Sequence, residues 1–99
     1  MPPLRHVVFH RPGPAWQPGV PMFEQPGLQG HADHWRIWLT EGRLALGGPF
    51  TDGAGGGMMV TRPGIGFDEV QDFALTDPCV ESGLLLVEVR PWFSAMQAA

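Results

Sequence analysis

The 99-residue sequence has few of the features that mark secreted or membrane proteins. Its single cysteine, Cys79, has no partner for an internal disulfide bond. No apolar run approaches the roughly 18 residues that a membrane-spanning helix needs. A charged segment followed by an apolar one, which would mark a signal peptide, is absent as well. These absences predict a cytoplasmic protein with no membrane partner.

Positive charge is also scarce. Lys and Arg together number six against ten Asp and Glu, and the formal net charge is −4 with a pI near 5.4. Proteins that bind nucleic acid or anionic membrane surfaces carry clustered Lys and Arg, and no such run is present here. We therefore expect no nucleic-acid partner.

Glycine and proline are abundant, with fourteen and eleven residues. They cluster between patterned segments, so they mark loops within a fold rather than disorder. The longest cluster is the Pro/Gly-rich loop at 11–27, which we interpret as a lid or binding loop. The length predicts one domain over residues 1–99. A domain of this size buries only about two thirds of its unfolded surface, so proteins of this size commonly rely on a partner for stability.

Six patterned segments lie between the loops. Four short runs rich in β-branched or aliphatic residues predict strands, and two amphipathic runs predict helices. The strands cover residues 5–10, 44–46, 58–62 and 84–90, and the helices cover residues 31–42 and 66–77. This β-α-β-β-α-β order is typical of a ferredoxin-like α+β sandwich, with two helices on one face of a four-stranded antiparallel sheet.

The first helix predicts part of the core. At 100° per residue, Trp35, Trp38 and Leu39 lie on the same side as His31, so these side chains are expected to point inward. The opposite face of the sheet has apolar residues at alternate positions and no further layer to cover it. We therefore expect two copies to pack sheet to sheet as a homodimer.

The topology also gathers chemically interesting residues at one end of the sandwich. Asp77 is expected at the C-terminal end of the second helix, before Pro78, where its charge opposes the helix dipole. Strand ends and helix ends that meet at this edge carry His10, the 11–27 loop, His31, Gly48, Pro49 and Asp77. A functional site is therefore predicted at this end.

Several short motifs follow the pattern of one known family. They are the spacing from His31 to Gly42, the Glu41–Arg43 helix end, the Gly48–Pro49 strand end, the Asp77–Pro78 step with Gly83 after it, and the closing segment Glu88–Trp92. Over residues 28–93 the chain resembles the YciI-like (YCII-related) family, whose members are ferredoxin-like dimers similar to muconolactone isomerases. The resemblance implies a dimeric α/β-barrel-type assembly and a catalytic His–Asp pair at His31 and Asp77. One relative is a dehydrochlorinase that acts on a chlorinated hydroxyhydroquinone.

A histidine beside a carboxylate is a coherent acid–base unit. The carboxylate selects one imidazole tautomer and raises its basicity, so the other ring nitrogen can take or give a proton. This suits isomerisation or elimination, including dehydrochlorination, of a cyclic or aromatic acid, with no cofactor. The catalytic candidates are His31 and Asp77, and the expected substrate-binding residues are His10, His34, Trp35, Gly48 and Pro49.

Other interpretations stay open. The His–Asp pair could be a structural hydrogen bond in a non-catalytic small-molecule-binding or accessory domain. A dimeric barrel of the oxygenase type, acting on quinol-like substrates, shares the topology. His31, His34 and Asp33, with His10, could hold Zn²⁺ or Fe²⁺, although Asp33 points away from His31, and we expect no metal. The apolar context of Cys79 predicts an inert, packed thiol.

Overall fold

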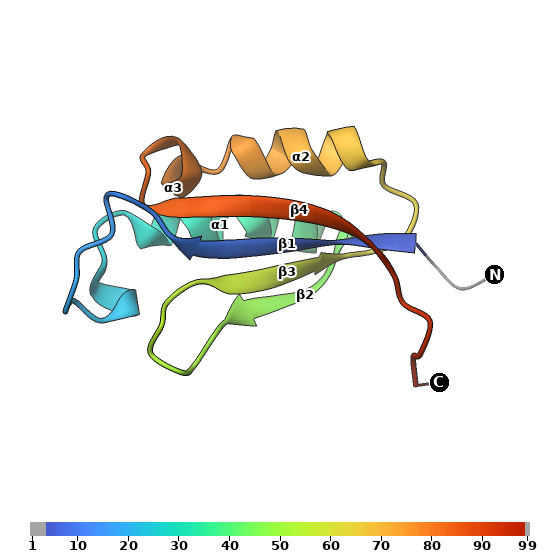
Figure 1. The fold of residues 1–99 in the computed structure, drawn as a ribbon. Coiled ribbons are helices and arrows are strands. Elements are labelled where there is room, and N and C mark those ends of the chain that lie inside the picture. The colour runs from blue at the N-terminus through green and yellow to red at the C-terminus, as the bar shows by residue number, and fades with distance from the viewer. Residues whose placement is uncertain (1–3, 99) are drawn as a thin grey trace.

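The computed structural model describes residues 4–98. They form a four-stranded antiparallel sheet in the order β2-β3-β1-β4, with the helices packed on one face (Figure 1). The strands are β1 (Leu4–Pro12), β2 (Leu44–Pro49), β3 (Gly57–Thr61) and β4 (Leu85–Phe93), and the helices are η1 (Met22–Glu24, a 3₁₀ helix), α1 (Leu28–Thr40), α2 (Phe67–Leu75) and α3 (Pro78–Glu81). The predicted ferredoxin-like α+β fold is confirmed.

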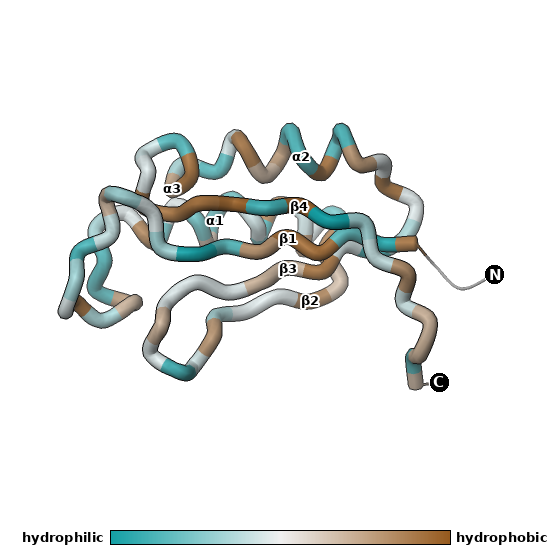
Figure 2. Tube along the Cα trace, viewed as in Figure 1, coloured by the Kyte–Doolittle hydropathy of each residue, from teal (hydrophilic) through white to brown (hydrophobic). Residues whose placement is uncertain are grey.

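The core lies between the sheet and the two long helices. Trp35 and Trp38 of α1 are 1% and 4% exposed, as predicted, and pack with Val8 of β1 and with Val70 of α2. Figure 2 shows hydrophobic stretches on both β1 and β4, which are neighbouring strands of the sheet. The prediction for Leu39 is wrong, because 52% of this residue is exposed. Helix α1 contacts β2, which is an edge strand, and within residues 4–98 no further strand lies beyond β2 to cover the margin of the apolar stripe.

Several element boundaries differ from those predicted. Strand β4 continues to Phe93, which pairs with Leu4, whereas the sequence predicted its end at residue 90. Pro91 is tolerated there because β4 is an edge strand and a proline without an N–H fits an unpaired edge. Residues 78–81, which lie between the predicted helix at 66–77 and the predicted strand at 84–90, form the short helix α3. Among the described helices, none combines the length and apolar character needed to cross a membrane.

The loop predicted as a lid is held in place by hydrogen bonds. The buried Gln25 accepts a bond from the backbone N–H of Gln17 and donates to the carbonyl oxygens of Gln17 and Val20. At its start, the N–H groups of Gly13 and Ala15 donate to backbone carbonyls just before β4. The start of the loop is therefore bonded to the segment before β4 and its interior is braced through Gln25, so the segment is ordered.

Candidate active site

Asp77 is fully buried and begins helix α3. Its Oδ1 accepts a hydrogen bond from the backbone N–H of Cys79 at 2.9 Å, and Pro78 occupies the first turn. The predicted position at the C-terminal end of α2 is wrong, because α2 ends at Leu75. Proline is well suited to the first position of a helix, so a new helix starts directly after Asp77. The carboxylate therefore caps a helix N-terminus, where the dipole favours its negative charge.

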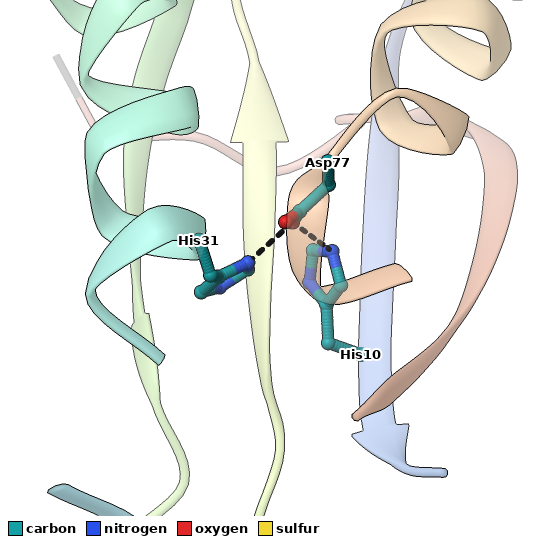
Figure 3. A group of neighbouring side chains, drawn as sticks. All are labelled: His10, His31 and Asp77. Carbon is teal, nitrogen blue, oxygen red and sulfur yellow. Dashed lines mark hydrogen bonds and ion pairs between the residues drawn. The ribbon is translucent and has the colours of Figure 1, made fainter. Parts of the chain in front are cut away.

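His31 meets this carboxylate from α1. Its Nδ1 lies 2.5 Å from Oδ2 of Asp77 (Figure 3), and the indole N–H of Trp35 donates to the same oxygen at 3.2 Å. The predicted proximity of His31 and Asp77 is confirmed. When Nδ1 donates to the carboxylate, Nε2 of His31 becomes the acceptor nitrogen of the neutral ring. The arrangement thus orients one imidazole and leaves its basic nitrogen for other chemistry.

The charge on Asp77 follows from its partners. Burial raises the pKa of this carboxyl, but the hydrogen bond and charge of His31, with the N–H of Cys79 and the nearby His10, outweigh burial and hold the pKa below 3.8. Asp77 is therefore ionised at neutral pH. An ionised carboxylate favours a positive charge on the adjacent imidazole, which is the form that His31 takes after it accepts a proton.

His10, on strand β1, lies next to both His31 and Asp77. Its ring is 3% exposed and stands edge-on to the ring of His31, with centres 4.6 Å apart. Its Nε2 is 3.9 Å from Oδ2 of Asp77, which places His31 and His10 on two sides of one carboxylate (Figure 3). Burial lowers the pKa of His10 to about 4, and the nearby His31 contributes. His10 is therefore neutral at pH 7.

A cavity of about 520 Å³ lies beside these residues, between α1, the β2–β3 end of the sheet and the lid. The predicted site residues that line it are His10, His31, Trp35, Gly48 and Pro49, and the lid contributes Trp16, Met22, Phe23 and Gln25. Met59 and Leu85 also line the cavity and were not predicted. The alternation of side chains along β3 could have placed Met59 on the helix-facing side.

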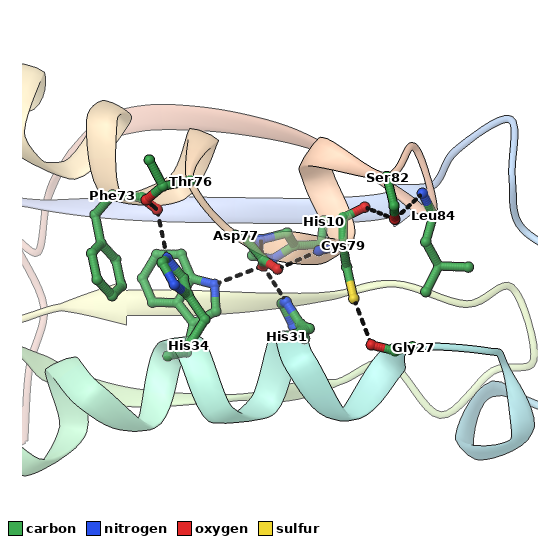
Figure 4. Close-up of polar contacts among 11 residues, drawn as sticks. His10, Gly27, His31, His34, Phe73, Thr76, Asp77, Cys79, Ser82 and Leu84 are labelled. Atoms are coloured by element: carbon green, nitrogen blue, oxygen red, sulfur yellow. Dashed lines mark hydrogen bonds and ion pairs between the residues drawn. The ribbon is translucent and has the colours of Figure 1, made fainter.

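His34 is the predicted binding residue that the structure does not bring to the cavity. Its Nε2 lies 2.7 Å from the backbone carbonyl oxygen of Phe73, and its ring stacks on the Phe73 ring (Figure 4). The buried thiol of Cys79 is also hydrogen-bonded, because it donates to the carbonyl oxygen of Gly27, and burial raises the pKa of this thiol. Both side chains hold the helices together.

The side chains that could hold a metal differ from the predicted set. His10, His31 and Asp77 offer ligand atoms within 4.8 Å of one another, a nitrogen and oxygen set that suits divalent transition metals. Asp33 instead accepts a hydrogen bond from Gln29 on the surface. Asp77 already accepts three N–H bonds, and a metal would have to displace the proton shared with His31. The hydrogen-bonded arrangement therefore favours proton transfer.

Comparisons with known proteins support the fold. No family model matches the chain, and no curated protein sequence matches it. A solved structure that is similar is 5-chloro-2-hydroxyhydroquinone dehydrochlorinase from Burkholderia phenoliruptrix, in complex with 2,5-dihydroxybenzoquinone. The identity is 22%, the TM-score is 0.54, and the match covers 89% of this chain and 92% of the dehydrochlorinase. This likeness shows a shared fold, and membership of the YciI-like family stays a prediction.

Proposed function

We propose that the chain is a small enzyme that transfers protons with the His31–Asp77 pair. The substrate is a small cyclic or aromatic compound, and the reaction is an isomerisation or an elimination such as dehydrochlorination. The observation that carries this proposal is the 2.5 Å contact between Nδ1 of His31, which lines the cavity, and the ionised Asp77, which is fully buried behind it. The bound ring ligand of the structurally similar dehydrochlorinase supports the substrate class.

The chemistry follows from the two nitrogens of His31. Nδ1 stays bonded to Asp77, and Nε2 takes a proton from a carbon or hydroxyl of the substrate next to a carbonyl. In an elimination, the electron pair of the broken bond forms a new double bond, and the halide leaves with its own pair. In an isomerisation, the imidazolium returns the proton at a different carbon. Asp77 stabilises the imidazolium between these steps.

A second function has one observation in its favour. Asp77 caps α3 and accepts the indole N–H of Trp35, so it would hold the structure together even without catalysis. In that case the chain is a non-catalytic binding domain that takes the same small molecules in its cavity. The two functions differ in whether the bound molecule exchanges protons.

The test measures proton exchange in D₂O by NMR, and chloride release, over a panel of cyclic acids, lactones and chlorinated hydroquinones. We expect His31→Ala to lower kcat by about 10²–10⁴-fold with the fold retained, because it removes a positioned base. His34→Ala is the matched control, since His34 lies on the same helix outside the cavity lining and should leave kcat unchanged. An active His31→Ala variant would contradict the proposal, whereas ligand binding without turnover by the parent would favour the binding domain.

The proposal includes a setting for this chemistry. We infer a cytoplasmic homodimer, an assembly that the YciI-like resemblance implies. The buried, hydrogen-bonded thiol of Cys79 is in keeping with a reducing compartment, because it makes no disulfide bond.

A further inference from the structure

His10 is a buried polar residue next to the His31–Asp77 pair, and it is not part of the proton transfer proposed for that pair. It is 3% exposed and lines the cavity, and neither ring nitrogen has a hydrogen-bond partner among the described residues. An unpaired buried polar group destabilises a fold, so nearly all such groups in native proteins are bonded to protein, water or ligand. An unpaired imidazole in a cavity wall therefore points to a bound molecule.

Asp77 is not the missing partner. Its Oδ2 lies 3.9 Å from Nε2 of His10, beyond hydrogen-bond distance, and already accepts bonds from His31 and Trp35. Figure 3 shows the two imidazoles approaching the carboxylate from different elements, α1 and β1. The pair therefore keeps its hydrogen bonds without His10.

The protonation state of His10 limits the chemical groups that its ring can bind. Burial, with His31 nearby, lowers its pKa to about 4, so at pH 7 the ring offers one N–H donor and one acceptor nitrogen. Such a ring can bond a hydroxyl or a carbonyl oxygen. A neutral ring has no positive charge to attract a carboxylate, and the negative charge of Asp77 close by disfavours an anionic group at this position. The oxygen that His10 receives is therefore an uncharged hydroxyl or carbonyl.

We propose a specific role for His10, which the sequence already predicts to bind substrate: its ring holds one oxygen of a ring ligand while His31 acts on a second oxygen or its neighbouring carbon. This inference rests on the proposed function and names its substrate class: a small ring with two oxygen substituents. The two imidazole rings are 4.6 Å apart between centres and inclined at 77°, so they address separate atoms of one ligand. The cavity, at about 520 Å³, accommodates a ring of this size.

His6 supplies a matched control on the same strand. It points to the same side of β1, is 8% exposed, and its Nδ1 also has no partner among the described residues. Its ring instead packs against Phe67 at 5.9 Å, and the described lining of the cavity includes His10 and not His6. A purely structural role for buried strand histidines would make the two positions behave alike.

The experiment compares binding of phenol, catechol and hydroquinone by NMR titration of the parent, His10→Leu, His10→Asn and His6→Leu. We expect the parent and His6→Leu to bind a dihydroxylated ring about tenfold more tightly than phenol, as one added hydrogen bond provides. His10→Leu should lose this preference, and His10→Asn, which keeps a donor and an acceptor, should retain part of it. Near-UV circular dichroism checks that each variant is folded. If His10→Leu does not fold, the test rests on His10→Asn, which should prefer the dihydroxylated ring over phenol less strongly than the parent does.

Three results would overturn the inference. They are no binding by the parent, equal binding of phenol and the dihydroxylated rings, and an equal loss of preference in the His6 and His10 variants. The titration needs no turnover, so its outcome is separate from that of the proposed function. If the parent prefers a dihydroxylated ring through His10 but catalyses no proton exchange, only the proposed catalysis is refuted. If it catalyses proton exchange but does not prefer a dihydroxylated ring, only the proposed role of His10 is refuted.

Discussion

A single buried residue, His10, should make the stability of this protein sensitive to mild acid. Its pKa is about 4 in the folded chain against 6.5 ordinarily. Because the folded pKa is lowered, the unfolded chain binds the proton more readily, and the stability that His10 contributes is complete above pH 6.5 and lost as the pH falls toward 4. We expect the free energy of unfolding to fall by about 3 kcal/mol over this interval.

Urea denaturation at a series of pH values measures this effect. His10→Leu should flatten the decline between pH 6.5 and 4, although His6, whose pKa burial also lowers, leaves a smaller slope of the same sign. Asp77 acts in a lower range. Its folded pKa lies below 3.8, so its contribution is present above that value and is lost as the pH falls further. An unchanged slope in His10→Leu would show that His10 is not the group that titrates.

At the scale of the element, α1 is held to the rest of the fold by its aromatic side. Trp38 stacks on Phe73 of α2 with ring centres 4.1 Å apart, and the Arg43 guanidinium lies over its ring. We expect Trp38→Ala to cost about 3–5 kcal/mol in the free energy of unfolding, because it leaves a large cavity. Domains of this kind have about 5–15 kcal/mol in total, so the variant should be close to unfolding.

The neighbouring residue provides the comparison. Leu39 is 52% exposed, so Leu39→Ala should lower the free energy of unfolding by less than about 1 kcal/mol, because the substitution removes little buried apolar area. Thermal melts of both variants give the difference. If both variants were destabilised equally, Leu39 would have to be buried as deeply as Trp38, and the buried face of α1 would be assigned wrongly.

At the scale of the whole molecule, the face of the sheet opposite the helices is the surface that a second copy would cover. Leu46 and Leu86 lie on this face and are 63% and 39% exposed. Apolar surface of this kind favours burial against a partner. The homodimer stays a prediction, and light scattering during gel filtration should give twice the chain mass of 10.8 kDa.

A charged substitution tests which surface makes the contact. Leu86→Glu should convert the dimer into a monomer, because it buries an unpaired carboxylate in the interface. Leu75→Glu is the control, since Leu75 lies on α2 and is 47% exposed. A parent chain that is monomeric at micromolar concentration would contradict the assembly, and a monomeric Leu75→Glu would move the contact to the helical face.

By itself, the sequence was enough for the order of the four strands and the two long helices and for the burial of Trp35 and Trp38. The helix and strand periods, the glycine after α1 and the proline that follows Asp77 act over a few residues, so they can be recognised without knowledge of the fold. The meeting of His31 and Asp77 was predicted too, from the resemblance and from a topology that brings the ends of two helices to one edge of the sheet. These features depend on local spacing and connectivity alone.

Only the tertiary structure decided the surroundings of that pair. It showed that Asp77 caps α3 instead of ending α2, that His34 turns to Phe73, and that His10 stands unpaired against His31. The contacts of His34 with Phe73 and of His10 with His31 join residues from different elements, and both depend on the depth at which one element packs on another. A pattern along one strand or helix gives the direction of a side chain, whereas its partner and its charge state are set by the residues packed around it.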